Sequence, residues 1–195
     1  MFFGREDILQ KLDALLGKHV ASLVTCRGRR RIGKSTLIEQ FARNNDARFI
    51  KIEGVRPTER TSNETELRSF AEQLAIQTDA ESSLPDNWLS AFKRLDHEIK
   101  DDALTVVLLD EISWMGRYDD LFADSIKIAW DNMWKKHDRL VLCRLLLRQT
   151  GISRQSCHSV DCSSLDFCPQ TFSTAKAVTN QIPYADVNNH QKILV

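Results

Sequence analysis

The stretch "GRRRIGKST", residues 28–36, lies between a run of apolar residues and a segment with the apolar spacing of a helix. Two glycines, Gly28 and Gly33, let the backbone curl so that successive N–H groups point into one concavity. The helix that follows adds its own unpaired N–H groups and the positive end of its dipole. The stretch therefore predicts a loop that holds a chain of phosphates, with the spacing G-x-x-x-x-G-K-[ST] of a P-loop.

The residues of this loop have distinct expected roles. Lys34 would reach the β- and γ-phosphates, Ser35 would ligate Mg²⁺ through its hydroxyl, and Thr36 would hydrogen-bond the α-phosphate. The other predicted nucleotide-binding residues are Gly28, Arg29, Arg30, Arg31, Ile32 and Gly33. The three arginines could contact DNA, but a positive rim around a polyanion pocket explains them more simply.

A second, independent motif lies farther along the chain. Val106 to Leu109 is an apolar run that ends in two adjacent carboxylates, Asp110 and Glu111, which is the Walker B pattern. Asp110 would hold the Mg²⁺, and Glu111 would act as general base on the attacking water. A solvated loop acid is the alternative reading of Glu111. Glu111 and Lys34 are the predicted catalytic residues.

Hydrophobic periodicity predicts strands that alternate with helices along the chain. Strands are expected at 20–26, 49–53, 103–111 and 139–143, and helices at 5–16, 33–45, 63–74, 88–99 and 122–133. Asn63 and Glu66 have the spacing of a capping box at the start of one helix. This alternation predicts an α/β fold of three α/β/α layers, with a mostly parallel sheet that is incomplete at its C-terminus.

Composition narrows the function classes. Lys and Arg together number 27, as do Asp and Glu, so no overall field draws the chain to DNA or to an anionic membrane. The N-terminus has no secretory signal and no apolar run is long enough to span a bilayer, which predicts a cytoplasmic protein without a membrane partner. The odd set of five cysteines argues against a disulfide framework.

The sequence changes character after Cys143. Residues 144–195 contain five Lys or Arg and three Asp or Glu residues, glutamate is absent, and Ser, Thr and Cys are frequent. We therefore expect a P-loop ATPase core at 1–143 and a poorly defined tail at 144–195, either disordered or translated from a shifted frame. Cys157, His158, Cys162 and Cys168 invite a zinc hypothesis, but their spacing matches no standard ligand pair.

Three segments resemble the AAA+ ATPases, in particular their archaeal-type branch near the STAND ATPases. They are "FFGREDILQKL" (2–12), "GRRRIGKSTLI" (28–38) and "VVLLDEISWM" (106–115). The resemblance implies Mg²⁺-dependent ATP binding and hydrolysis, and a sheet in which the fourth strand lies between the P-loop strand and the Walker B strand. It also implies that Phe3 and Gly4 lie near the adenine, and it allows a homo-oligomer or a protein partner.

The chain also departs from this family after the fourth strand. The sensor residue, arginine finger and helical lid that such ATPases carry have no counterpart that the sequence identifies. Four hypotheses follow: an ATPase, a nucleotide-dependent binding switch with little hydrolysis, a nucleic-acid-binding ATPase, and an inactive truncated product. The absence of a recognisable sensor and arginine finger favours the switch for this chain. A P-loop kinase is less favoured than an ATPase, because the adjacent Glu111 suits activation of water better than transfer to a second substrate.

Overall fold

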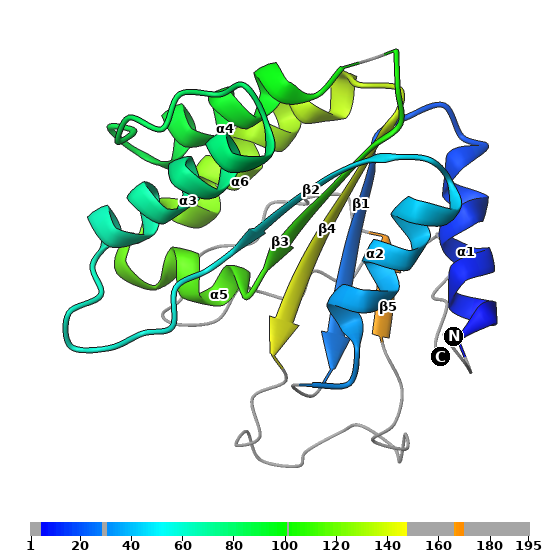
Figure 1. The fold of residues 1–195 in the computed structure, drawn as a ribbon, viewed down its shortest axis with the longest axis horizontal. Helices are drawn as coiled ribbons and strands as arrows, with labels where there is room; N and C mark the ends of the chain where they lie inside the picture. The colour runs from blue at the N-terminus through cyan, green and yellow to red at the C-terminus, as the bar shows by residue number, and fades with distance from the viewer. Residues whose placement is uncertain (1–4, 29–30, 101, 148–165, 170–195) are drawn as a thin grey trace.

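Helices cover both faces of a mostly parallel sheet in the computed structural model of this chain, which describes residues 5–28, 31–100, 102–147 and 166–169 (Figure 1). The strands are β1 (Ser22–Gly28), β2 (Arg48–Glu53), β3 (Thr105–Asp110), β4 (Leu140–Leu147) and β5 (Asp166–Pro169). The helices are α1 (Glu6–Leu16), α2 (Lys34–Asn44), α3 (Asn63–Gln77), α4 (Trp88–Glu98), α5 (Ile112–Met115) and α6 (Phe122–Asn132), with short 3-10 turns η1 (Gly116–Tyr118) and η2 (Trp134–Lys136). None of the described helices has the length and apolarity needed to cross a membrane.

The strand order is β2-β3-β4-β1-β5 among the described residues, with β5 antiparallel to β1 and the other pairs parallel. Strand β4 therefore lies between the P-loop strand and the Walker B strand, as the family resemblance implied. The registers Val24↔Cys143 and Val106↔Val141 align the three central strands. Because these strands are parallel, the carboxyl ends of β1 and β3 reach the same edge of the sheet. The predicted three-layer α/β fold is confirmed.

Two hydrophobic clusters lie between the sheet and its helices, one on each face, and β3 contributes residues to both. All six residues of β3 are buried; Val106 and Leu108 pack toward α1 and α2, whereas Val107 and Leu109 pack toward α3, α4 and α6. A strand buried on both faces reads as a continuous apolar run, which is why the sequence predicted this strand well. The cluster on the side of α3, α4 and α6 has an aromatic centre made of Phe70, Trp88, Phe92, Phe122 and Trp134.

The cap of α3 differs from the predicted one by a residue. Ser62 is the N-cap, and its side chain and that of Thr65 form the capping box. Asn63 instead accepts a 2.8 Å hydrogen bond from the Trp88 indole, and Glu66 accepts one of 3.0 Å from the backbone N–H of Val55. The prediction of an Asn63–Glu66 box was therefore wrong, because tertiary contacts engage both side chains.

Strand β4 continues to Leu147, beyond the predicted end at Cys143. The extension has a direct cause: β1 continues to Gly28, and its last residues pair with residues 144–147 of β4. Most of the predicted tail lies outside the described residues, including Cys157, His158 and Cys162. Cys168 belongs to β5 and pairs with Thr25 of β1. The tail's origin in a shifted frame stays a prediction.

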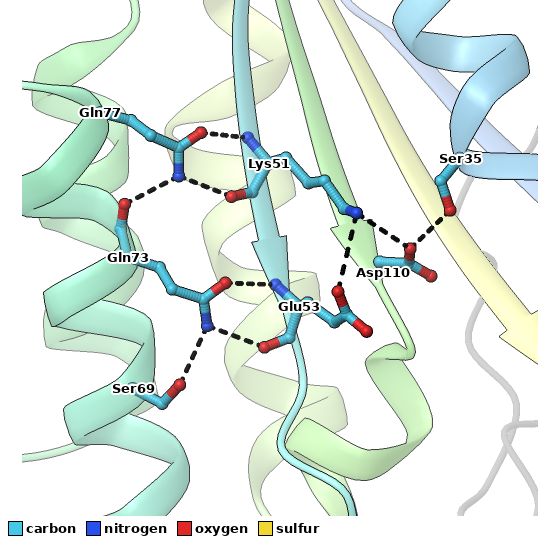
Figure 2. A network of polar contacts seen from close by, with 7 residues as sticks. All are labelled: Ser35, Lys51, Glu53, Ser69, Gln73, Gln77 and Asp110. Atoms are coloured by element: carbon cyan, nitrogen blue, oxygen red, sulfur yellow. Dashed lines mark hydrogen bonds and ion pairs between the residues drawn. The ribbon is translucent and has the colours of Figure 1, made fainter.

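Two glutamines of α3 cover the edge of β2 that faces away from β3 (Figure 2). The side-chain oxygen of Gln77 accepts from the backbone N–H of Lys51 at 2.9 Å, and its amide donates to the Lys51 carbonyl at 2.6 Å. Gln73 pairs with the backbone of Glu53 in the same way, with both hydrogen bonds at 2.9 Å. Four helical residues rise about 6 Å and two strand residues about 6.6 Å, so the two spacings match. We call these two glutamines the glutamine clamp.

We expect the double variant Gln73→Leu, Gln77→Leu to lower the free energy of unfolding by about 1–3 kcal/mol, because it leaves backbone groups of β2 without partners. Urea denaturation would measure the change. Gln40→Leu on α2 is the matched control, since the Gln40 amide bonds to Asn44 of its own helix and its loss should cost under about 0.5 kcal/mol. Equal stability of the double variant and the control would contradict a stabilising role for the clamp.

Candidate active site

The loop before α2 is curled by two residues with left-handed backbone. Arg31 has φ 64° and Gly33 has φ 79°, and the Gly33 carbonyl accepts the Leu37 N–H at 3.0 Å to begin the helix. Gly33 adopts this conformation without the steric cost that a side chain would bring. The first N–H groups of an α-helix have no acceptor within the helix, which makes the N-terminus of α2 a favourable place for an anion held by the loop.

Arg5, directly before α1, contacts this loop through its side chain. Its guanidinium donates a hydrogen bond to the carbonyl of Ile32, and its Nη1 atom lies 4.0 Å from where a Cβ of Gly33 would stand. Ile32 thus contributes its backbone, which is fixed to the start of α1. Arg5 was not among the predicted site residues. The "GRED" at the helix start was the available signal, but spacing alone did not link it to the loop.

Ser35 and Asp110 meet across the site. The Ser35 hydroxyl donates to Asp110 Oδ2 at 2.6 Å, which joins the first turn of α2 to the end of β3 (Figure 2). Asp110 is only 7% exposed. Mg²⁺ prefers oxygen ligands and is commonly held by one or two protein side chains together with phosphates and water. A hydroxyl and a carboxylate oxygen in contact at the phosphate loop therefore fit this ion.

Glu111 lies at a sharp turn after β3. Its φ of 52° is left-handed, it precedes α5, and its carbonyl accepts the Trp114 N–H at 2.8 Å. The residue is 8% exposed, so it is not the solvated loop acid of the alternative reading. A non-glycine residue in this backbone region carries a conformational cost, which functional sites often retain.

Lys34 is 7% exposed. Burial raises the pKa of the neighbouring Cys26 thiol to about 12, and the charge of Lys34 opposes this with a smaller lowering. Cys26 therefore stays a neutral, buried thiol. Cys143 on β4 is likewise buried, and burial also raises the pKa of its thiol.

Two charged residues of β2, neither of which was predicted from the sequence, also belong to the site. Lys51 Nζ lies 3.8 Å from Asp110 Oδ2 and 3.6 Å from Glu53 Oε2. Glu53 is the register partner of Asp110, so both side chains emerge at the same edge of the sheet. The charged residues at the end of this strand, in "KIEG", were visible in the sequence. Their place at the site was not, because it depends on β2 lying beside the Walker B strand.

These side chains surround a cavity of about 350 Å³ at the carboxyl edge of the sheet. Its lining residues are Arg31, Gly33, Lys34, Ser35, Thr36, Lys51, Glu53, Asp110 and Glu111. Seven of the predicted site residues are thus gathered at one place. Gly28 ends β1, whereas Arg29, Arg30, Phe3 and Gly4 lie outside the described residues, so the predictions for these four are not addressed.

A parallel sheet with this strand order, and a curled loop that leads from β1 into a helix beside a carboxylate at the end of β3, define a P-loop nucleotide-binding domain. The chain belongs to the AAA domain family, whose model matches residues 18–142. The predicted AAA+ P-loop class is therefore confirmed.

Solved structures that are similar to this chain include ORC proteins and a Walker-type ATPase. The Aeropyrum pernix ORC2 protein is 16% identical over 72% of this chain and 39% of its own, with a TM-score of 0.49. A chain of the Drosophila ORC bound to AT-rich DNA and Cdc6 is 14% identical over 73% and 46%, with a TM-score of 0.44. A Walker-type ATPase of Pyrococcus abyssi is 21% identical over 74% and 45%, with a TM-score of 0.47.

This chain therefore spans less than half the length of those three structures. No curated protein matched the sequence.

We expect Gly54→Ala to disturb the site from the β2 side. A Cβ at Gly54 would lie 2.8 Å from the Glu111 carbonyl and 3.2 Å from the Met115 backbone nitrogen, so the Glu111 turn must shift. Such overpacking should lower the free energy of unfolding by about 1–3 kcal/mol. Chemical denaturation would measure it.

Gly17→Ala is the matched control. Gly17 has φ −71° and open space around its Cα, so alanine should leave stability unchanged or raise it by up to about 1 kcal/mol. If Gly54→Ala is as stable as Gly17→Ala, the close approach of β2 to the Glu111 turn does not constrain the site.

Proposed function

We propose that this domain binds ATP with Mg²⁺ and hydrolyses it. The observation that carries the proposal is the 2.6 Å contact between the Ser35 hydroxyl and the Asp110 carboxylate, in the same cavity as Lys34 and Glu111. Membership of the AAA domain family supports nucleotide binding independently of this geometry. The position of Arg31 on the cavity wall favours a phosphate-binding role for this arginine over a DNA contact.

Different residues of this chain would bind the phosphates, hold Mg²⁺ and activate the attacking water. The loop N–H groups and Lys34 would hold the β- and γ-phosphates in line with the attacking water. Ser35 and Asp110 would hold Mg²⁺, which neutralises charge on the phosphate oxygens when bound. Glu111 would orient the water and accept its proton as the oxygen bonds to the γ-phosphorus, and the bond to the ADP oxygen breaks. Inorganic phosphate and ADP would then leave.

We expect Lys34→Ala to weaken ATP binding by about tenfold to a hundredfold or more, because it removes a charge-assisted contact to the phosphates. Titration with a fluorescent ATP analogue would measure the dissociation constant. Lys127→Ala, on the surface of α6 and outside the cavity, should bind as the unaltered chain does. Absence of nucleotide binding by folded, unaltered chain would refute the proposed function.

We expect Glu111→Gln to keep ATP binding and to slow phosphate release by about a hundredfold to ten-thousandfold, the range of a lost general base. A phosphate-release assay would measure the rate. Glu39→Gln on α2 is the matched carboxylate-to-amide control, since Glu39 is exposed and pairs with Arg43. Binding without turnover in the unaltered chain would instead assign the nucleotide-dependent binding switch.

A further inference from the structure

Lys51 lies on the wall of the cavity opposite the phosphate loop, next to the residues that would hold Mg²⁺. Its ammonium nitrogen is 3.8 Å from Asp110 Oδ2, the same oxygen that accepts the Ser35 hydroxyl at 2.6 Å. It is also 3.6 Å from Glu53 Oε2. Figure 2 shows the Lys51 side chain extending from β2 across to Asp110. Lys51 thus supplies positive charge to a pair of carboxylates at the metal site.

The backbone that carries Lys51 is held in place. The glutamine clamp occupies the outward N–H and carbonyl groups of both Lys51 and Glu53, and β3 pairs with the inner edge of the same strand. The Gln77 amide also donates to the Gln73 carbonyl, and the Gln73 amide donates to Ser69, so the clamp is itself fixed on α3. The backbone position of Lys51 is therefore fixed, whereas its four-carbon side chain can still change rotamer.

A divalent cation at Asp110 would change the environment of this ammonium. Mg²⁺ and the Lys51 ammonium are like charges, and both are attracted by Asp110 Oδ2. When the metal takes over that carboxylate, the ammonium keeps Glu53 as a partner and is attracted toward a phosphate group that carries more negative charge than this single carboxylate. A bound triphosphate carries its highest negative charge on the γ-phosphate, whereas a diphosphate ends at the β-phosphate and lacks that group.

We propose that Lys51 is the residue that discriminates nucleoside triphosphate from diphosphate. Without nucleotide it lies between Asp110 and Glu53, where it occupies part of the metal site, and with the metal–triphosphate complex it pairs with the γ-phosphate. With a diphosphate no γ-phosphate is present, so the ammonium stays at Asp110 and Glu53 and competes with the metal. This inference rests on the proposed function, because it requires that the cavity bind a metal–nucleotide complex.

The test is a comparison of two affinities in Lys51→Met. Dissociation constants for a non-hydrolysable ATP analogue and for ADP, each with Mg²⁺, would be measured by calorimetry on the full chain. We expect the analogue to bind about tenfold to a hundredfold more weakly, the range for one charge-assisted contact, while ADP affinity is unchanged or increases. Lys51→Arg should keep the preference for the triphosphate. Lys127→Met, on α6, is the control for loss of a surface lysine.

A second arm needs no nucleotide. Mn²⁺ as a probe for the metal should bind the nucleotide-free Lys51→Met chain more tightly than the unaltered chain, because the competing ammonium is gone. Electron paramagnetic resonance would report free Mn²⁺. Thermal melting of every variant would verify that it folds, and Lys51→Gln replaces Lys51→Met if the latter does not.

The outcomes separate this inference from the proposed function. If the unaltered chain binds no nucleotide, the proposed function fails. If it binds the triphosphate in a Lys34-dependent way but Lys51→Met keeps the same ratio of affinities, the discrimination by Lys51 is overturned. An equal loss for both nucleotides would also overturn it, since a merely structural or general electrostatic role predicts that result. If Lys51→Met and the unaltered chain bind Mn²⁺ with the same affinity, the inference that Lys51 competes with the metal at Asp110 is overturned.

Discussion

The 2.6 Å hydrogen bond from Ser35 to Asp110 joins two segments that are 75 residues apart in the chain. It requires the parallel alignment of β1, β4 and β3, which brings the start of α2 and the end of β3 to one edge of the sheet. The hydrophobic clusters on both faces stabilise that alignment, and the fully buried β3 belongs to both. The cavity, the Glu111 turn and the contact with Lys51 all depend on the same alignment.

Much of this fold could be predicted because β3 contains four consecutive apolar residues, 106–109, and several of the helices are amphipathic. Such patterns indicate burial directly, so the order of strands and helices along the chain needed no further information. Strand order did not follow from periodicity; it came from the family resemblance. The cap of α3 shows the limit of local rules: Ser62 and Asn63 are both good caps, and the bond from the Trp88 indole to Asn63 decides between them.

The candidate site was predicted only where a contiguous motif marks it. Lys34, Ser35 and Asp110 stand in such motifs, and the structure brings them together. Arg5 and Lys51 do not, because their roles depend on which strand or helix becomes a neighbour in space. Lys51 looks like an ordinary surface lysine until β2 is placed beside β3. Residues of this kind can be found only after the topology is known.

The glutamine clamp also limits how this domain can assemble with others. An unpaired strand edge is a common place for another chain to add a strand of its own. At β2 the outward groups of residues 51 and 53 are already bonded to side chains of the same molecule, and an incoming peptide would have to displace both glutamines. Sheet extension by a second chain is thus disfavoured at residues 51 and 53 of β2, because it would have to break hydrogen bonds within the domain.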